Sequence, residues 1–408
     1  MSFFVLLLLS IAILPLAYRR FWDSNRNKAI LSAILSLPVV ILLCHYHHLH
    51  SFLYEMKEYF SFIVLLASLF VISGGIFLSG DIEATPLNNT LFLLIGGFTA
   101  NILGTTGAAM LMIRPFLRTN SKRQLIAHIP VFFIFIVCNI GGCLTPIGDP
   151  PLFIGYLRGV PFFWTLRLLP QWTFMMAALL IVFYFVDVHF WRRESLQAIR
   201  LDKKMTASIS LRGKRNLLFI LGVLLSVIFL DTPLREAVMM GLSAFSLIST
   251  PKDIHKQNHF HYTPIIEVAI LFAGIFVTMV PALLILEARG AELGVRLPWH
   301  FFWITGGLSS FLDNIPTYAT FLSFAQALSR ATGLSKEIVG IPIKYLEAIS
   351  VGAVFMGANS YIGNGPNFMV KAVCEHRGVN IPSFFGYMLW SCGILIPLFI
   401  TATFIFFV

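Results

Sequence analysis

The sequence predicts an all-α polytopic membrane protein with ten spanning helices in two inverted repeats, each holding a re-entrant hairpin and a broken helix. Its 408 residues are 57% hydrophobic and 12% charged, with a mean hydropathy of +0.83, which is too apolar for a soluble domain of this length. Apolar segments long enough to cross a bilayer recur along the chain. Two of them are interrupted by glycine, proline and polar residues at corresponding places.

The first interruption covers residues 139–153, which contain three glycines, three prolines, Asn139, Thr145 and Asp149. Proline lacks an N–H group and clashes with the preceding turn, so a helix should stop near Asn139 and restart near Pro150. Bare backbone at membrane depth is tolerated only where protein buries it or where it lines a polar cavity. In transporters such breaks are where ions and substrates bind.

The second interruption covers residues 357–368 and repeats the first at an offset of 215 residues. The positions that correspond are Gly142 and Gly357, Thr145 and Ser360, Ile147 and Ile362, Gly148 and Gly363, Asp149 and Asn364, Pro151 and Pro366, and Phe153 and Phe368. Paired interruptions in two hydrophobic segments predict an internal repeat, and they point to the binding site of a transporter.

The crossings follow in chain order. We predict them at residues 1–17, 29–44, 60–79, 125–157 (broken), 164–190, 216–231, 234–250, 265–286, 345–373 (broken) and 383–407. The first repeat then takes residues 1–190, a basic cytoplasmic linker takes 191–215, and the second repeat takes 216–408. Each repeat has five crossings, and repeats with an odd number of crossings must be inverted relative to each other.

Two further apolar stretches, 88–113 and 299–325, carry polar residues and glycine or proline at their middles. Two half-length arms with a polar tip fit this pattern, so we expect hairpins that enter and leave on one side of the membrane. A spanning helix with a kink is the alternative reading of each stretch.

The basic residues predict the orientation. With the linker in the cytoplasm, 20 of the 29 Lys and Arg residues fall in inside loops. Both chain ends then lie outside, in a multi-pass protein of the bacterial inner (plasma) membrane. The net charge of +10 is thereby explained without nucleic acid as a partner.

Four acidic residues are predicted near the membrane interior, where an ionised carboxylate is costly and usually marks an ion path. Asp149 fits this role and also fits a helix N-cap before Pro150. For Asp313 the functional role is favoured over a turn cap, because Asn314 alone could cap. Glu267 and Glu347 lie nearer helix starts and should reach interfacial water or pair with a basic side chain. A cluster of histidines, His45, His47, His48 and His50, is expected in a solvated outside loop with Glu55 and Glu58.

Neutral oxygen-bearing side chains gather at the same hairpin tips and helix breaks. Such oxygens and freed backbone carbonyls bind hard monovalent cations, and half-helix N-termini can hold the charge of an anion. The candidate site residues are Asn101, Thr105, Thr106, Asn139, Thr145, Asp149, Asp313, Asn314, Thr317, Asn359, Ser360, Asn364 and Asn367, with Asp149 and Asp313 as sodium ligands.

Two motifs resemble the ion transporter superfamily that includes NhaD-type sodium/proton antiporters, citrate and dicarboxylate carriers, and arsenite permeases. Residues 139–149 are similar to the glycine-rich "PIGD" break of the NhaD-type antiporters, and residues 313–317 resemble their Asp-Asn hairpin. The resemblance implies a scaffold domain, a mobile transport domain, elevator-like movement and a homodimer. Residues 101–107 lack the expected second Asp-Asn pair, and Pro150-Pro151 stand where small hydroxyl residues are expected. The chain is also similar to a branch of citrate carriers in the same superfamily.

The function predicted first is sodium/proton antiport at Asp149 and Asp313. The alternative is a sodium-coupled citrate, dicarboxylate or other small-anion transporter, in which the hydroxyl-rich tips hold the carboxylates of the substrate. An enzyme is not expected, because the sequence has no nucleophile–base pairing and no metal-ligand spacing. The expected partners are the lipid bilayer, small ions or a small organic anion, and a second copy of the chain. No cofactor is expected beyond the transported sodium ion and proton.

Overall fold

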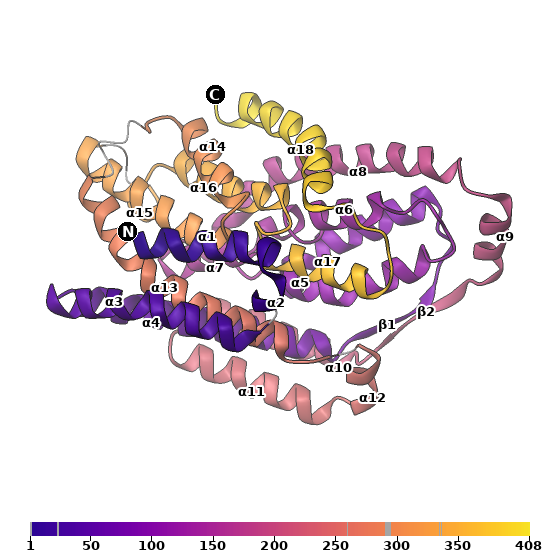
Figure 1. Ribbon diagram of the computed structural model, residues 1–408, viewed down its shortest axis with the longest axis horizontal. Coiled ribbons are helices and arrows are strands. Elements are labelled where there is room, and N and C mark those ends of the chain that lie inside the picture. The colour runs from indigo at the N-terminus through magenta and orange to yellow at the C-terminus, as the bar shows by residue number, and fades with distance from the viewer. Residues whose placement is uncertain (1, 23, 259, 290–294, 334, 336) are drawn as a thin grey trace.

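The computed structural model describes residues 2–22, 24–258, 260–289, 295–333, 335 and 337–408. The described chain is built almost entirely of helices, with a two-stranded sheet at one end (Figure 1). The elements up to the linker are α1(Ser2–Ala17), α2(Arg19–Trp22), α3(Asn25–His45), α4(Leu49–Gly74), β1(Phe77–Asp81), α5(Pro86–Thr119), α6(His128–Ile136), η1(Ile140–Leu144), α7(Pro150–Leu157), η2(Phe162–Leu168) and α8(Leu169–Trp191).

The remaining elements begin in the predicted linker, which is itself partly structured. They are α9(Leu196–Lys204), β2(Ala207–Arg212), α10(Arg215–Phe229), α11(Leu234–Ser249), α12(Lys252–Gln257), α13(Thr263–Arg289), α14(Pro298–Ser309), α15(Asn314–Thr332), α16(Ile343–Met356), η4(Gly357–Asn359), α17(Gly365–His376) and α18(Phe384–Phe406). Strand β2 pairs antiparallel with β1, with Phe77 opposite Arg212, so the linker is tied to the chain just before α5.

The chain is an integral membrane protein by the length and composition of its helices. Six segments of the described chain are long and apolar enough to cross a bilayer: 25–45, 49–74, 86–119, 162–191, 263–285 and 384–406. Helices α1, α10 and α11 have 16, 15 and 16 residues, fewer than the roughly 20 that a perpendicular crossing needs. The count of ten crossings therefore stays a prediction.

Helix α5 folds back on itself at Gly104, whose φ of +74° is a conformation that glycine adopts without strain. Its two arms lie side by side: the Nδ2 of Asn89 donates to the Oδ1 of Asn120 at 2.9 Å, and the rings of Phe92 and Phe116 stack at 4.8 Å. The segment 86–119 is thus a hairpin of two arms and not one straight helix. Helices α14 and α15 form a second such pair and pack through Phe301 and Phe324.

Both broken helices are interrupted in the same way. Helix α6 ends at Ile136, and the chain passes through η1 before α7 starts at Pro150. Helix α16 ends at Met356, and η4 precedes the start of α17 at Gly365. The backbone angles agree at corresponding positions, with φ and ψ of −138° and 151° at Thr145 against −140° and 167° at Ser360. The two breaks therefore share one backbone path.

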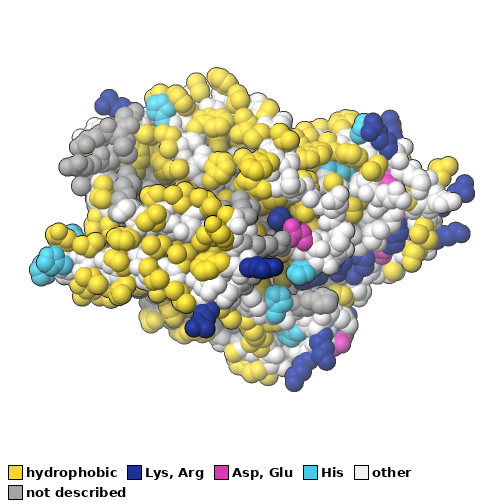
Figure 2. Space-filling view, in the orientation of Figure 1, with side chains coloured by type: hydrophobic (Ala, Val, Ile, Leu, Met, Phe, Trp, Pro, Cys, Tyr) yellow, Lys and Arg dark blue, Asp and Glu magenta, His cyan; other side chains and the backbone are white. Residues whose placement is uncertain are grey.

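These interrupted helices occupy the middle of the molecule, where every residue of α6 is buried (Figure 1). Helices α3, α4, α11 and α13 pack together on one side of them, and α8 and α18 contact each other on another. Lys and Arg side chains gather at the end that carries β1, β2 and α9, while hydrophobic side chains cover much of the opposite end (Figure 2). The fold thus places its polar breaks in an apolar interior.

The start of α4 corrects one expectation. The helix begins at Leu49 and not near residue 60, so Glu55 and Glu58 belong to a helix and not to a solvated loop. Both are buried, and both accept hydrogen bonds from the guanidinium of Arg158 at 2.9–3.2 Å. Hydropathy misplaces this helix start because it cannot anticipate a basic partner about 100 residues away.

Candidate functional site

The side chain of Asp149 lies where both hairpin tips and both helix breaks meet. It has no solvent exposure. Its Oδ1 accepts from the Oγ1 of Thr105 at 2.9 Å and from the Nδ2 of Asn364 at 3.3 Å, and its Oδ2 accepts from the Nδ2 of Asn314 at 2.9 Å. Thr105 follows the turn of the first hairpin, Asn314 starts the second arm of the other, and Asn364 belongs to the second break. One carboxylate thus joins elements from both halves of the chain.

The capping alternative for Asp149 does not hold in this structure. The residue stands at the N-cap position of α7, yet its side chain makes no capping hydrogen bond. Its acceptor capacity goes to the three donors described above, which lie in other segments. The carboxylate is therefore held by tertiary contacts and not by its own helix.

Asp313 has the capping role instead. Its Oδ1 accepts from the backbone N–H of Ile315 at 3.0 Å, and its carbonyl accepts from the Oγ1 of Thr317 at 3.0 Å. The expectation that Asn314 would cap and leave Asp313 free is wrong, because the Asn314 amide reaches across to Asp149. The two aspartates thus have different surroundings, and only Asp149 bonds to both hairpins.

A chain of amides links the two breaks. The Nδ2 of Asn364 also donates to the carbonyl of Cys138 at 3.0 Å and to the Oδ1 of Asn139 at 3.2 Å. The Nδ2 of Asn139 donates to the Oδ1 of Asn367 at 2.8 Å, and the Nδ2 of Asn367 donates to the carbonyls of Gly357 and Ser360 at 2.9 Å. These bonds satisfy backbone carbonyls that the helix breaks leave without a helical partner.

Each hairpin tip is joined to the break of its own half by an equivalent hydrogen bond. The Oγ1 of Thr145 donates to the carbonyl of Asn101 at 2.6 Å, and the Oγ of Ser360 donates to the carbonyl of Ser310. In the first half the Oδ1 of Asn101 also accepts from the backbone N–H of Leu144 at 2.8 Å. The hydroxyl at the matching position of each break therefore binds the neighbouring tip.

Two buried oxygen atoms at the second tip and second break have no hydrogen-bond donor among the described residues: the Oδ1 atoms of Asn314 and Asn359. The Nδ2 of Asn359 donates to the Oγ of Ser310 at 2.8 Å, which fixes the amide. A buried acceptor without a donor is unfavourable unless a ligand satisfies it. Amide oxygens are suitable ligands for a monovalent cation.

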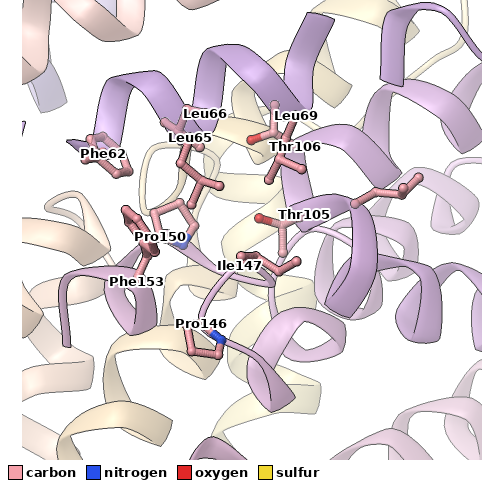
Figure 3. Close-up of a pocket in the computed structure, with 12 residues that line it drawn as sticks. Phe62, Leu65, Leu66, Leu69, Thr105, Thr106, Pro146, Ile147, Pro150 and Phe153 are labelled. Atoms are coloured by element: carbon pink, nitrogen blue, oxygen red, sulfur yellow. The ribbon is translucent and has the colours of Figure 1, made fainter. Parts of the chain in front are cut away.

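A small cavity of about 10 Å³ lies beside the first tip, room for about one water molecule. Figure 3 shows α4 on one side of it, with Phe62 and Leu69, and the polar side chains of Thr105 and Thr106 near the loop that follows η1. Drug-sized ligands occupy cavities of about 300–1,000 Å³. The site is therefore closed around its own side chains in this conformation.

Sequence reasoning missed several residues that hold the breaks in place. The Nε1 of Trp172 on α8 donates to the carbonyl of Gly141 at 3.1 Å. On α18, Tyr387 and Ser391 donate to the carbonyls of Ala358 and Asn359, both at 2.7 Å. Single polar residues in apolar helices were the available signal, but nothing local shows which break they face.

The other two acidic residues are placed as expected. Glu267 pairs with Lys28 at 2.7 Å and Glu347 with Lys344 at 3.0 Å, so both meet a basic side chain away from the four tips and breaks. Within the described ranges, no group of three or more His, Cys, Asp or Glu residues is arranged to hold a metal ion.

Comparison with known families decides the class of protein. Residues 1–407 match the model of a family described as "Putative citrate transport". The chain belongs to this family. It is a transporter family and not an enzyme family, which confirms the prediction of a transporter in the superfamily of ion and citrate carriers. No curated protein matches the chain.

Membership of the citrate transport family favours the second of the two predicted functions over the first. The family description fits the alternative, a carrier of citrate or a related anion, and gives no support to sodium/proton antiport. The resemblance to NhaD-type antiporters stays a prediction.

Proposed function

We propose that the chain is a sodium-coupled secondary transporter of a small di- or tricarboxylate, with citrate as the reference substrate. The observation that carries this proposal is one fully buried carboxylate, that of Asp149 in the first break, which accepts hydrogen bonds from neutral donors of both hairpins and the second break. Neutral amides and hydroxyls bind the carboxylates of a substrate without adding charge. A single acidic side chain beside them supplies a ligand for the coupling cation.

The donors around Asp149 mark where a substrate would bind. Thr105, Asn314 and Asn364 each give one hydrogen bond to this carboxylate, and a substrate carboxylate offers the same acceptor geometry. We infer that a substrate takes over these donors when the hairpins separate, and that the released Asp149 oxygens ligate the sodium ion together with the amide oxygen of Asn314. The donor-free state of that amide oxygen supports this assignment.

The proposed architecture is two inverted repeats of five crossings that move as a scaffold and a transport domain. It is supported by the matching backbone of the two breaks and by the equivalent bonds of Thr145 and Ser360. The base of the first hairpin contacts Asp187 at the linker end of α8, which fits a cytoplasmic hairpin. Both labelled chain ends lie away from the basic end in Figure 1, as expected for termini outside a bacterial inner membrane. A homodimer follows from the family resemblance.

Sodium/proton exchange is the second candidate. The observation that favours it is again the complete burial of Asp149, because a carboxylate shared by a proton and a sodium ion exchanges the two by competition. Asp313 is a weaker partner for this mechanism than the sequence indicates, since its Oδ1 caps α15.

Thermal unfolding of the purified protein separates the two candidates, because a ligand stabilises the state that it binds. The panel is sodium, lithium, citrate, succinate and arsenite, singly and in pairs. We expect sodium and citrate together to raise the unfolding temperature by more than the sum of their separate effects. Asp149→Asn should abolish this cooperativity, and Asp313→Asn, which can still cap, should keep it. Stabilisation by sodium alone with no effect of any anion would support exchange and contradict the carrier.

A further inference from the structure

A second cavity, of about 690 Å³, lies far from the hairpin tips at the base of the first hairpin. Its walls come from the end of α5, the loop that joins α5 to α6, Phe190 near the end of α8, and the chain that follows α17. This volume falls in the range of about 300–1,000 Å³ that small-molecule sites occupy. The cavity at the tips does not.

Three arginines line this basal cavity, and two of them have no carboxylate bonded to them in the described chain. Arg123 is neutralised, because it pairs with Asp187 at 2.6 Å and lies 3.8 Å from Glu194. Arg118 donates only to a backbone carbonyl, that of Leu78 at 3.1 Å, and its buried Nε has no acceptor. Arg377 likewise donates to a backbone carbonyl, at 3.3 Å.

The nearby acidic side chains are already bonded elsewhere, and Glu375, two residues before Arg377, pairs with Lys371 at 3.2 Å. Asp81, the acidic residue with an electrostatic effect on Arg118, is bonded to Lys122. Glu194 accepts from the backbone N–H groups of Gln124 and Leu125. The neutral lining adds donors of its own, including Ser121, Gln124 and Asn380. The cavity therefore presents uncompensated positive charge and neutral donors to anything that enters it.

Helix C-termini attract basic residues on their own, which accounts for Arg118 and Arg377 taken singly. It does not account for the convergence of both on one cavity of ligand size, or for a buried guanidinium N–H without an acceptor. Guanidinium groups bind carboxylates through paired hydrogen bonds, and two of them match a polyvalent carboxylate.

We infer that this basal cavity is a binding site for a soluble di- or tricarboxylate, separate from the central site, with Arg118 and Arg377 as its charged ligands. This inference rests on the proposed function for the identity of the anion. The cavity lies at the base of the α5 hairpin and at the C-terminal end of α17. The tip of that hairpin and the start of α17 reach the central site, and the 12 residues of α17 span about 18 Å. An anion held here is concentrated near the transport pathway, whereas a cation is repelled.

The test measures citrate binding to the full-length protein in neutral detergent and low salt, with and without sodium, by calorimetry. The variants are Arg377→Gln, Arg118→Gln, and Lys203→Gln as the matched control. Lys203 is an exposed residue of α9 at the same end of the molecule, so its change removes one positive charge outside the cavity. The parent and each variant are also measured in combination with Asp149→Asn, which removes the central carboxylate.

We expect a sodium-independent component of citrate binding that persists in Asp149→Asn and weakens about tenfold in each arginine variant, for the loss of a charge-assisted contact. It should also weaken as salt rises, because the charges are partly exposed. Lys203→Gln should bind like the parent. Equal weakening by Lys203→Gln, or no change in Arg377→Gln, would overturn the inference.

A lipid headgroup offers oxyanions as well, so the measurement is repeated in phosphatidylcholine and phosphatidylglycerol nanodiscs. Two results together would identify a lipid site and contradict the inference. Phosphatidylglycerol would abolish citrate binding, and the protein would retain that lipid only when the arginines are present. The proposed function fails separately, since it requires a sodium-dependent component that Asp149→Asn removes. The sodium-independent, arginine-dependent component is measured separately. Its presence or absence therefore does not depend on whether the sodium-dependent component is found.

Discussion

The first and second helix breaks follow the same backbone path but differ in chemistry at the residue just before the helix restarts. Asp149 and Asn364 stand 215 positions apart, both in extended backbone, with φ of −137° and −152°. Neither caps its helix, and a proline follows within two residues in each case. The two side chains bond to each other at 3.3 Å, with the amide as donor and the carboxylate as acceptor.

This difference shows how a repeated scaffold can hold a single charge. Two aspartates at these positions would place two carboxylates within hydrogen-bond distance in a buried site, where like charges cannot both stay ionised. An asparagine in the second break removes that repulsion and supplies a donor. The backbone is duplicated, whereas the charge is not.

Replacing Asp149 should have the largest effect. Asp149→Ala leaves the donors of Thr105 and Asn314 without their acceptor, at a cost of about 1–3 kcal/mol for each buried group, whereas the Asn364 amide keeps its acceptors in the first break. Asp149→Asn keeps one acceptor oxygen and should lose less stability, yet it should abolish transport because the charge is gone. Chemical unfolding and vesicle uptake measure the two effects. Equal loss of stability in both variants would contradict the described hydrogen bonds.

Exchanging Asp149 and Asn364, the residues just before each helix restarts, tests whether the breaks are interchangeable. Asp149→Asn with Asn364→Asp moves the carboxylate to the second break and keeps the pair of donor and acceptor. We expect unfolding stability close to the parent and transport above that of Asp149→Asn alone. Asn364→Asp by itself, with two facing carboxylates, is the control and should be the least stable of the three. A double variant no better than this control would mean that only the backbone is repeated.

Removing the hydroxyl of either break should lower the free energy of unfolding by a smaller amount, and the two amounts should differ. Thr145→Val removes one hydrogen bond, to the carbonyl of Asn101, at about 0.5–1.5 kcal/mol. Ser360→Ala removes the bond to the carbonyl of Ser310 and also the acceptor of the Ile362 N–H, so its cost should be larger. Denaturant unfolding of the two variants gives the comparison, and a larger cost for Thr145→Val would be the unexpected result.

How far the sequence predicts this site depends on whether the signal is local. Glycine and proline near Asn139 and Pro150 act on the adjoining backbone, and the helix there ends and restarts close to the predicted residues. The cap next to Asn314 is also local, but two neighbouring residues could each form it, and only the distant position of Asp149 decides between them. Such contacts depend on tertiary packing, which no pattern within one segment specifies.

The same limit explains two other outcomes. The sequence predicts a loop at Glu55 and Glu58 because Arg158, which pairs with both, comes from another part of the chain. The role of Trp172 could not be predicted, because its partner, the carbonyl of Gly141, is a backbone atom with no sequence signature. Hydropathy and spacing predict the structure that a segment prefers in isolation. The positions of these residues are instead set by contacts with distant parts of the chain.

Asp313 should give the smallest effect and thereby separate the two aspartates. Asp313→Ala removes the cap of α15 at about 1 kcal/mol, and Asp313→Asn, which can still cap, should cost only a few tenths. Transport should continue in both, in contrast to Asp149→Asn. Stability is measured by denaturant unfolding and transport by vesicle uptake. Loss of transport in Asp313→Asn with normal stability would restore the two-aspartate site that the sequence indicates.

Uptake of labelled citrate into proteoliposomes, driven by an inward sodium gradient, tests the central claim most directly. The claim is that one carboxylate of the first break, held by both hairpins and the second break, couples a cation to a carboxylate substrate. We predict uptake in the parent that requires the sodium gradient, near-complete loss in Asp149→Asn, and retention in Asp313→Asn. Sodium-driven uptake of equal rate in Asp149→Asn, or no citrate uptake alongside sodium-driven proton movement in the parent, would contradict it.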